Sequence, residues 1–305
     1  MSRTRLRGIY PIVPTPFDER GGLDLESIAR MARFMAGCGV QGLAILGVMG
    51  EADKLTDPER ARVIAAFREA LPGDRALVVG AGAPGTLAAI DAAKRALDLG
   101  ADALLVAPPP AQSDQAIYAH YEGVARAAGA TIVIHDYPAS TGILMSAELL
   151  ARLADDAGIE YVKLEDAPTG PKMARVQALV RGDLKIFGAL GGQYALEELE
   201  RGAVGIMTGF AYPELLVRLF ELYGAGRHED AAALFYAIVP LVRFEFQPKL
   251  GISLRKHILV RRGAIANAAV RQPGMDADEV TLRQLQRIVE HLERSGILAR
   301  CAAPR

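Results

Sequence analysis

The sequence predicts an α/β protein, a (β/α)8 TIM barrel followed by a C-terminal helical extension. Short apolar segments alternate with longer amphipathic ones through the first 225 residues, and eight such strand–helix units follow one another. After residue 225 the alternation stops and only helical patterns remain. Parallel strands joined by helices in unbroken succession close into a barrel of this size. We therefore expect a barrel catalytic domain at residues 1–225 and a helical extension at residues 226–305.

The expected strands are short apolar runs, and the expected helices are longer segments with apolar residues at helical spacing. The strands are residues 9–14, 42–46, 76–80, 103–107, 131–135, 161–163, 185–187 and 205–207. The helices of the barrel are residues 24–38, 57–70, 86–98, 114–128, 146–156, 170–180, 193–200 and 213–224. Those of the extension are residues 228–247, 250–262 and 277–295.

Cap and turn residues support these boundaries. Thr56 precedes Asp-Pro-Glu, which places a hydroxyl at the N-cap, a proline in the first turn and acids where the helix dipole favours them. Ser113 and Ser146 begin two further helices similarly. The helix-to-strand returns carry glycine, as helix C-termini prefer, at positions 39, 100, 129, 158 and 202. A doubly wound open sheet is the alternative, but no Gly-x-Gly-x-x-Gly follows the first strand.

The composition argues against several kinds of partner. A net charge of −1 gives no electrostatic basis for binding nucleic acid or an anionic membrane, and no run of about 18 apolar residues could span a bilayer. The five histidines lack ligand-like spacing, so neither a metal nor a cofactor is expected. No apolar signal segment follows the basic N-terminus, and Cys38 and Cys301 are expected to be free thiols. We expect a cytoplasmic protein.

The most informative strand runs from Gly158 to Asp166. Side chains alternate along a strand, so Tyr161, Lys163 and Glu165 share one face. An ammonium is costly to bury on an apolar strand unless it is paired or used. At the C-terminal end of a barrel strand, such a lysine can lose its proton and attack a carbonyl. The alternative is a structural Lys163–Glu165 ion pair.

Active sites of such barrels form at the C-terminal ends of the strands. The second strand ends in Gly47-Val48-Met49-Gly50, whose glycines let the backbone approach a ligand and whose N–H groups could hold a carboxylate. A simple turn would have the same sequence. Glu51 could be catalytic, a local cap or a buried structural acid.

The fifth strand ends in His135-Asp-Tyr137. Strands five and six are neighbours in a barrel, so His135 could point at Lys163, although a lone histidine is more often a satisfied polar group. Asp136 would face the helices and hold structure, and a role for Tyr137 stays open.

Three further strand-end segments complete the candidate site. Ser140 and Thr141 form either a turn or a hydroxyl pair aimed at substrate. The loop after Gly188 and the strand end at Ile206 suit a small acidic substrate, yet both could be tight turns. In the extension, Arg255-Lys256 and Arg261-Arg262 are expected to form a solvated face, as charge runs on helices usually do.

These residues together resemble the dihydrodipicolinate synthase / N-acetylneuraminate lyase superfamily of class I (Schiff-base) aldolases and dehydratases. The resemblance covers essentially the whole chain. It is carried by the segment 8–18, Gly47-x-x-Gly-Glu51, Leu55-Thr56, Glu59-Arg60, Tyr137-Pro, Thr141-Gly142, Lys163 and the Gly188 loop. The resemblance implies a (β/α)8 barrel with a helical extension, assembled as a homotetramer. It also implies that Lys163 forms an imine with C2 of pyruvate or another 2-oxo acid.

The chain departs from the superfamily pattern at recognition and relay positions. Val48 and Met49 stand where hydroxyl residues usually bind the substrate carboxylate, and His135 aligns with the catalytic tyrosine. No tyrosine is present in Pro108-Pro-Pro110, where the neighbouring subunit's tyrosine falls in dihydrodipicolinate synthase. Ser140 aligns with the arginine that binds the aldehyde substrate there. These departures argue against dihydrodipicolinate synthesis.

The remaining pattern resembles the branch that dehydrates 2-keto-3-deoxy sugar acids, with L-2-keto-3-deoxyarabonate dehydratases as the nearest family. This resemblance implies an iminium on Lys163, with Glu165 removing a C3 proton. His135, or a water held by Ser140 or Thr141, would then assist loss of the C4 hydroxyl. Retro-aldol cleavage that releases pyruvate is one alternative, but it needs a base on the C4 hydroxyl, usually tyrosine in this superfamily. A non-catalytic sugar-acid-binding protein on the same scaffold is the other.

Overall fold

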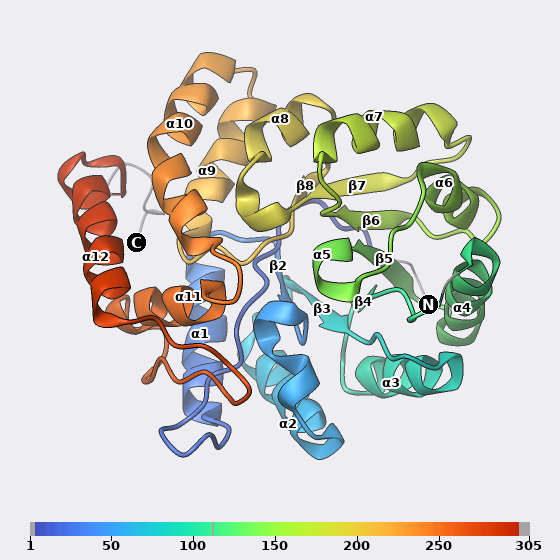
Figure 1. Ribbon diagram of the computed structural model, residues 1–305, viewed down its shortest axis with the longest axis horizontal. Coiled ribbons are helices and arrows are strands. Elements are labelled where there is room, and N and C mark those ends of the chain that lie inside the picture. The colour runs from blue at the N-terminus through green and yellow to red at the C-terminus, as the bar shows by residue number, and fades with distance from the viewer. Residues whose placement is uncertain (1–3, 112, 299–305) are drawn as a thin grey trace.

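The structure is a computed structural model and describes residues 4–111 and 113–298. Its centre is an eight-stranded parallel sheet in the order β1-β8-β7-β6-β5-β4-β3-β2. A parallel bridge between Ile12 and Ala44 joins the chain after β1 to β2. The strands therefore form a nearly closed ring, and helices surround it (Figure 1). The predicted (β/α)8 barrel with C-terminal helices is confirmed.

The elements follow the predicted order closely. The strands are β1 (Gly8–Ile9), β2 (Gly42–Ile45), β3 (Ala76–Gly80), β4 (Ala103–Val106), β5 (Thr131–Asp136), β6 (Tyr161–Leu164), β7 (Lys185–Gly188) and β8 (Gly205–Ile206). The barrel helices are α1 (Leu25–Gly37), α2 (Asp57–Ala70), α3 (Thr86–Asp98), α4 (Asp114–Ala128), α5 (Pro138–Thr141), α6 (Ala147–Asp155), α7 (Thr169–Leu179), α8 (Ala195–Glu200) and α9 (Pro213–Gly224). Three 3-10 turns are η1 (Val48–Gly50), η2 (Ala52–Lys54) and η3 (Leu190–Gly192).

Two local differences have simple physical reasons. Residues 9–14 were expected to be one strand, but regular pairing ends at Ile9 because the prolines at 11 and 14 have no N–H to donate. The Ile12 N–H still bonds to Thr208 O of the β8 end at 3.0 Å, and Val13 N–H bonds to Ala44 O at 3.0 Å. After β5, the segment for which a turn was one of two alternatives forms the short helix α5, with proline in its first turn.

The helix caps confirm the local sequence analysis. Thr56 accepts a hydrogen bond from Glu59 N–H, and the Glu59 carboxylate accepts one from Thr56 N–H, which together form a capping box at the start of α2. Ser113 and Ser146 cap α4 and α6 through their hydroxyls. These caps fix where each helix leaves the strand-end loops that form the barrel mouth.

The core has two layers. The barrel interior is filled by side chains that include Tyr10, Val133, Tyr161, Phe187 and Met207, all nearly fully buried. The Tyr10 and Phe187 rings meet edge to face with centroids 5.5 Å apart. A second, larger apolar cluster lies between the outer faces of the strands and the surrounding helices. This packed interior leaves the C-terminal ends of the strands as the place for a site.

Three helices follow the barrel: α10 (His228–Glu245), α11 (Gly251–Arg261) and α12 (Glu279–Arg294). Helix α10 packs against α9 and α12, and the three lie together on one side of the barrel, coloured orange to red in Figure 1. The division into two domains at residue 225 stays a prediction.

The expected solvated face on α11 is wrong for its first two basic residues. Arg255 is only 5% exposed and Lys256 is fully buried, because this end of α11 is covered by other parts of the chain. Each cation has a carboxylate partner, Glu245 for Arg255 and Glu51 for Lys256. Arg261 and Arg262 are more exposed and pair with Glu293 and Glu214.

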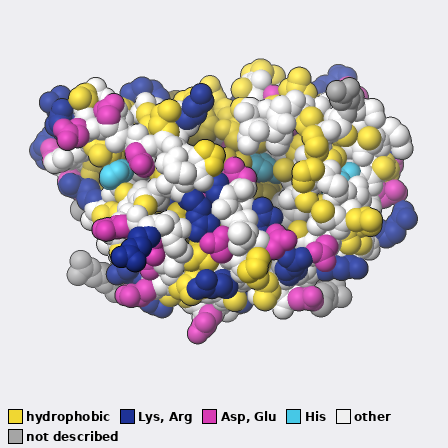
Figure 2. Space-filling view, turned by 60° about the horizontal axis from the view of Figure 1, so that its bottom comes forward, with side chains coloured by type: hydrophobic (Ala, Val, Ile, Leu, Met, Phe, Trp, Pro, Cys, Tyr) yellow, Lys and Arg dark blue, Asp and Glu magenta, His cyan; other side chains and the backbone are white. Residues whose placement is uncertain are grey.

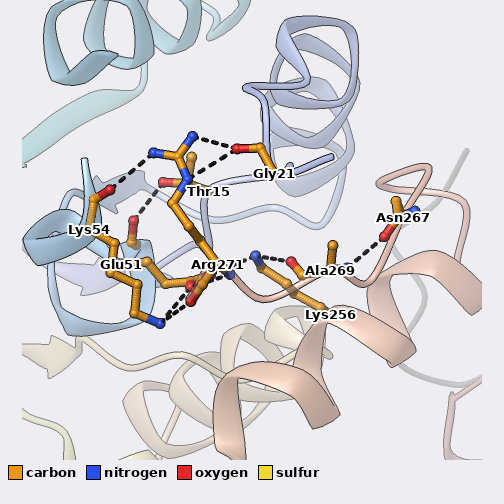
Figure 3. Close-up of polar contacts among 9 residues, drawn as sticks. Thr15, Gly21, Glu51, Lys54, Lys256, Asn267, Ala269 and Arg271 are labelled. Carbon is orange, nitrogen blue, oxygen red and sulfur yellow. Dashed lines mark hydrogen bonds and ion pairs between the residues drawn. The ribbon is translucent and has the colours of Figure 1, made fainter. Parts of the chain in front are cut away.

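Lys256 and Arg271 tie the extension to the loop after β2 (Figure 3). Glu51 Oε1 accepts a hydrogen bond from Lys256 Nζ at 2.6 Å, while Oε2 accepts from Lys54 Nζ at 2.9 Å and Arg271 N–H at 3.0 Å. Lys256 also donates to Ala269 O at 2.7 Å. Both oxygens of this buried carboxylate are thus engaged, which favours the structural alternative for Glu51.

Cys38 is a buried free thiol, and Cys301 lies outside the described residues. Within the described ranges, no helix is both long and apolar enough to cross a membrane. Acidic and basic side chains are interspersed over the face shown in Figure 2.

Candidate active site

Lys163 lies at the C-terminal end of β6, in register with His135 on β5 and Phe187 on β7. Two residues earlier on β6, Tyr161 points into the barrel interior, so alternation directs Lys163 the same way. Lys163 is 3% exposed and His135 is 6% exposed. The strand order therefore brings together two residues that are 28 positions apart in the sequence.

Lys163, Glu165 and His135 form a triangle of polar atoms. His135 Nε2 lies 3.2 Å from Lys163 Nζ and 3.0 Å from Glu165 Oε2. Lys163 Nζ also hydrogen-bonds to Glu165 Oε2. The His135 nitrogen can donate to Glu165 in one tautomer and accept from Lys163 in the other. The three sequence-predicted catalytic residues are thus in mutual contact.

Burial sets the protonation of the two nitrogen bases. Removal from water disfavours the ammonium form, so the pKa of Lys163 is well below its usual value of 10.5. The charge of Arg255 lowers this pKa further, and the negative charge of Glu198 opposes the shift. Burial, together with the charge of Lys163, also lowers the pKa of His135 well below 6.5. His135 is therefore neutral near pH 7, and Lys163 loses its proton more easily than an ordinary lysine does.

The glycine-rich loop after β7 holds Glu165 in place. Glu165 Oε1 accepts a hydrogen bond from Leu190 N–H at 3.1 Å, and Glu165 N–H donates to Asp136 O at 2.8 Å. Leu190 has a φ of 43°, an uncommon value for a residue with a side chain. Such strain persists where the surroundings over-determine the backbone, often at functional sites.

Tyr137 lies beside the triangle. Its ring stacks on His135 at 5.8 Å between centroids and lies 5.7 Å from Lys163 Nζ. Burial raises the pKa of the Tyr137 hydroxyl, so it stays protonated. The intervening Asp136 faces the helices and forms an ion pair with Lys172 of α7 at 2.7 Å. The predicted outward orientation and structural contact of Asp136 are confirmed.

The loop Gly47–Gly50 forms the short turn η1 at the end of β2. Val48 is 46% exposed, whereas the side chain of Met49 reaches the guanidinium of Arg255. Thr15 Oγ1 donates to Gly50 O at 2.7 Å and holds the loop (Figure 3). The first N–H groups of such a turn have no acceptor within it, so the backbone of this loop has donors to offer a ligand.

Four other residues were predicted to bind substrate: Ser140, Thr141, Gly188 and Ile206. Only some of them have a polar group free to do so. Ser140 is exposed on α5, and the Thr141 hydroxyl is already bonded to Tyr137 O at 3.1 Å and to Ile143 N–H at 3.2 Å. Gly188 packs so closely on the Glu198 carboxylate that a Cβ atom would lie 2.2 Å from Oε2. The Ile206 side chain belongs to the outer apolar cluster, and its carbonyl accepts from Tyr10 N–H at 3.0 Å.

Sequence reasoning missed three buried charged residues near the mouth. Glu198 on α8 lies behind Gly188, and burial raises its pKa to about 8. Glu245 on α10 pairs with Arg255 on α11, and burial raises the Glu245 pKa to about 7. No local signal separates these residues from ordinary surface charges, because their burial depends on how the helices pack on the barrel.

Comparison with known proteins places this chain in a class of lyases. The Dihydrodipicolinate synthetase family matches residues 5–292. The chain belongs to this family, whose members are class I aldolase-type lyases, and it is therefore an enzyme of that kind.

Named relatives differ in activity. The chain is 33% identical over 302 residues to the L-2-keto-3-deoxyarabonate dehydratase of Azospirillum brasilense, with 96% of each chain covered. It is 28% identical to a 4-hydroxy-tetrahydrodipicolinate synthase of Porphyromonas gingivalis, over 96% of this chain and all of that one. The crystal structure of a dihydrodipicolinate synthase from Rhodopseudomonas palustris superposes with a TM-score of 0.89 at 32% identity, over 94% of this chain and 98% of that one.

Proposed function

We propose that this lyase dehydrates a 2-keto-3-deoxy sugar acid, such as L-2-keto-3-deoxyarabonate, to a dioxo acid through an imine on Lys163. The observation that carries the proposal is the buried triangle of Lys163, Glu165 and His135. It joins an amine of lowered pKa, a carboxylate and a neutral imidazole at one barrel mouth. The name of the Azospirillum relative agrees with this chemistry.

The first step is attack of Lys163 Nζ on the C2 carbonyl of the substrate. Because burial lowers its pKa, a larger fraction of Lys163 carries the lone pair that this attack needs. A carbinolamine forms and loses water to give an iminium, which makes the C3 protons acidic. The substrate is a small-molecule 2-oxo acid, and the iminium formed with Lys163 is the electron sink.

The second step is proton transfer at C3 and loss of the C4 hydroxyl. Glu165 takes a C3 proton and becomes a carboxylic acid, and the resulting enamine expels the C4 hydroxyl, which leaves as water with a proton. Water then hydrolyses the iminium and frees Lys163, and the unsaturated product tautomerises to the dioxo acid. The net change is loss of one water molecule.

The acid in this step is better assigned to Glu165 than to His135. The sequence had suggested His135, but its lowered pKa leaves the imidazole neutral, and a neutral imidazole is a weak acid. Glu165 has just gained the C3 proton and can return it to the departing hydroxyl. We assign His135 to holding Glu165 through the 3.0 Å contact between Nε2 and Oε2.

Substrate contacts complete the proposal. Backbone N–H groups of the loop Gly47–Gly50 would face the 2-oxo acid, with the Gly188 and Ile206 strand ends closing the far side of the mouth. Ser140 and Thr141 on α5 would lie toward the distal hydroxyls. We further propose that the protein is cytoplasmic and, as its resemblance implies, a homotetramer, which sedimentation equilibrium would test.

The test is incubation with a panel of 2-keto-3-deoxy acids and identification of products by mass. Dehydration gives a product one water lighter than its substrate, whereas retro-aldol cleavage releases pyruvate. Borohydride reduction in the presence of pyruvate should label the wild-type chain and leave Lys163→Met unlabelled. Release of pyruvate from every substrate that is turned over would show that the enzyme is an aldolase and not a dehydratase. If neither an adduct nor turnover is found, the result would favour a non-catalytic sugar-acid-binding protein.

A further inference from the structure

Arg255 is a buried cation whose hydrogen-bonding capacity is only partly used. Its Nε donates to Glu245 Oε2 at 3.2 Å, and its Nη1 lies 2.9 Å from the sulfur of Met49. Its Nη2 is buried and has no hydrogen-bond partner among the described residues. A thioether is a weak acceptor, so two of the three guanidinium nitrogens lack a strong one. Leaving a buried charged donor without an acceptor is unfavourable.

The guanidinium lies at the barrel mouth. Met49, which it contacts, is in η1 at the end of β2 and approaches Gly209 after β8, where an added Cβ would lie 2.9 Å from Met49 Cγ. The positive charge of Arg255 is close enough to lower the pKa values of Lys163 and Tyr137. Arg255 therefore faces the same space as the amine of Lys163, although it comes from helix α11 of the extension.

The protein supplies only part of the counter-charge for this cation. Glu245 is its carboxylate partner, and burial raises the Glu245 pKa to about 7. Near neutral pH that carboxyl is therefore partly protonated. Val48 and Met49, in the η1 loop that Arg255 contacts, carry no hydroxyl. The mouth thus holds an under-neutralised guanidinium beside a loop whose side chains offer no strong acceptor.

A carboxylate is the ligand group that matches these features. It accepts charge-assisted hydrogen bonds from guanidinium nitrogens and supplies the missing charge. In a 2-oxo acid the C1 carboxylate is bonded directly to C2, the carbon that the proposed function joins to Lys163. It is also the only anionic group of a 2-keto-3-deoxy sugar acid.

We propose that Arg255 binds the C1 carboxylate of the substrate through its unpartnered Nη2, so that the helical extension contributes a specificity-determining residue to the barrel site. This inference rests on the proposed 2-oxo acid substrate but not on whether the enzyme dehydrates or cleaves it. Recognition of the carboxylate would come from a residue 206 positions away from the η1 loop that it contacts.

The test compares pyruvate with its neutral methyl ester by calorimetry, which reports affinity whether or not an imine forms. In Arg255→Met, pyruvate affinity should fall roughly 10- to 100-fold, as expected for losing hydrogen bonds from a charged group. The affinity for methyl pyruvate should change by less than about threefold. An equal loss for both ligands, or no loss for pyruvate, would overturn the proposal.

Lys256→Met is the matched control. It removes the next residue of the same helix, which is also buried and ion-paired but contacts Glu51 instead of the mouth. This variant should lose stability while keeping the wild-type preference for pyruvate over its ester. If Arg255→Met does not fold, Arg255→Lys keeps the charge with a shorter reach, and it should weaken pyruvate binding selectively. An unchanged preference in folded Arg255→Lys would contradict the assignment.

The control experiment also separates this inference from the proposed function. Selective loss of pyruvate binding in Arg255→Met, with no borohydride adduct in the wild type, would support Arg255 and overturn the imine mechanism. A strong adduct on Lys163 with no selective loss of pyruvate binding in Arg255→Met would support the imine mechanism and overturn the role of Arg255.

Discussion

Lys163 with Glu165 and Lys256 with Glu51 are two buried lysine–glutamate pairs in the same molecule, and they differ in where they lie and in which residues surround them. Glu51 accepts from three donors, and Lys256 donates to both Glu51 and Ala269 O. The Lys256 ammonium also lies 4.4 Å from the centre of the Phe17 ring. This second pair is a closed network of charges and donors that joins α11 to the β2 loop.

The Lys163 pair is also fully hydrogen-bonded, through His135 and Leu190 N–H, but it is open in the sense that it lies at the barrel mouth. Burial lowers the pKa of both lysines. At Lys256 the paired Glu51 opposes the shift, whereas at Lys163 the opposing charge is that of Glu198 and the charge of Arg255 lowers the pKa further. The same residue types therefore serve different ends. The pair that joins α11 to the β2 loop stabilises the fold, whereas the pair at the barrel mouth places an amine of lowered pKa where a substrate can reach it.

Replacing each lysine by methionine should give the largest difference between the two pairs. Lys163→Met should abolish the borohydride adduct and lower turnover by roughly 10⁴-fold or more, because it removes the nucleophile. Lys256→Met should keep turnover within about threefold but lower the free energy of unfolding by about 3 kcal/mol, because Glu51 loses a buried partner. Urea denaturation and steady-state assays measure the two effects. Equal loss of activity in both variants would erase the distinction.

The two carboxylates provide the next largest contrast. Glu165→Gln should still form the imine with pyruvate but lose about 10²–10⁴-fold in turnover, because an amide cannot take the C3 proton. Glu51→Gln should affect stability first, since its oxygens hold the β2 loop and the extension together. Mass spectrometry of the reduced adduct separates imine formation from turnover. Wild-type turnover in Glu165→Gln would remove this residue from the base role.

The sequence was sufficient for contacts that follow from strand order and alternation. Lys163, Glu165 and His135 could be placed together because β5 and β6 are adjacent and their ends coincide. It was insufficient for Arg255 and Lys256, because their partners Met49 and Glu51 are more than two hundred positions away. A pair of basic residues on a helix has the same local pattern whether the face is solvated or covered. Only the packing of α11 against the mouth distinguishes the two.

The pH dependence of imine formation should separate the two lysine environments. Only the unprotonated amine attacks a carbonyl, and burial places the pKa of Lys163 well below 10.5. The rate of adduct formation with pyruvate should therefore rise with pH and reach its plateau well below pH 10.5. Because the charge of Glu198 raises the Lys163 pKa, Glu198→Gln should move the half-maximal pH further down. A wild-type rate that still rises steeply near pH 10.5 would mean an ordinary lysine.

The smallest expected effect on turnover concerns His135. This residue contacts both Lys163 and Glu165, and the Lys256–Glu51 pair has no such neighbour in the contacts described above. His135→Phe keeps a planar ring against Tyr137 but removes the hydrogen bond to Glu165. Losing one hydrogen bond to a carboxylate should lower turnover about tenfold while leaving imine formation intact. If His135 instead delivered the proton to the leaving hydroxyl, the loss would reach the 10²–10⁴-fold range of a general acid. Steady-state turnover, measured beside borohydride trapping, decides whether His135 positions Glu165 or donates the proton. Only proton donation would make His135→Phe as damaging as Glu165→Gln.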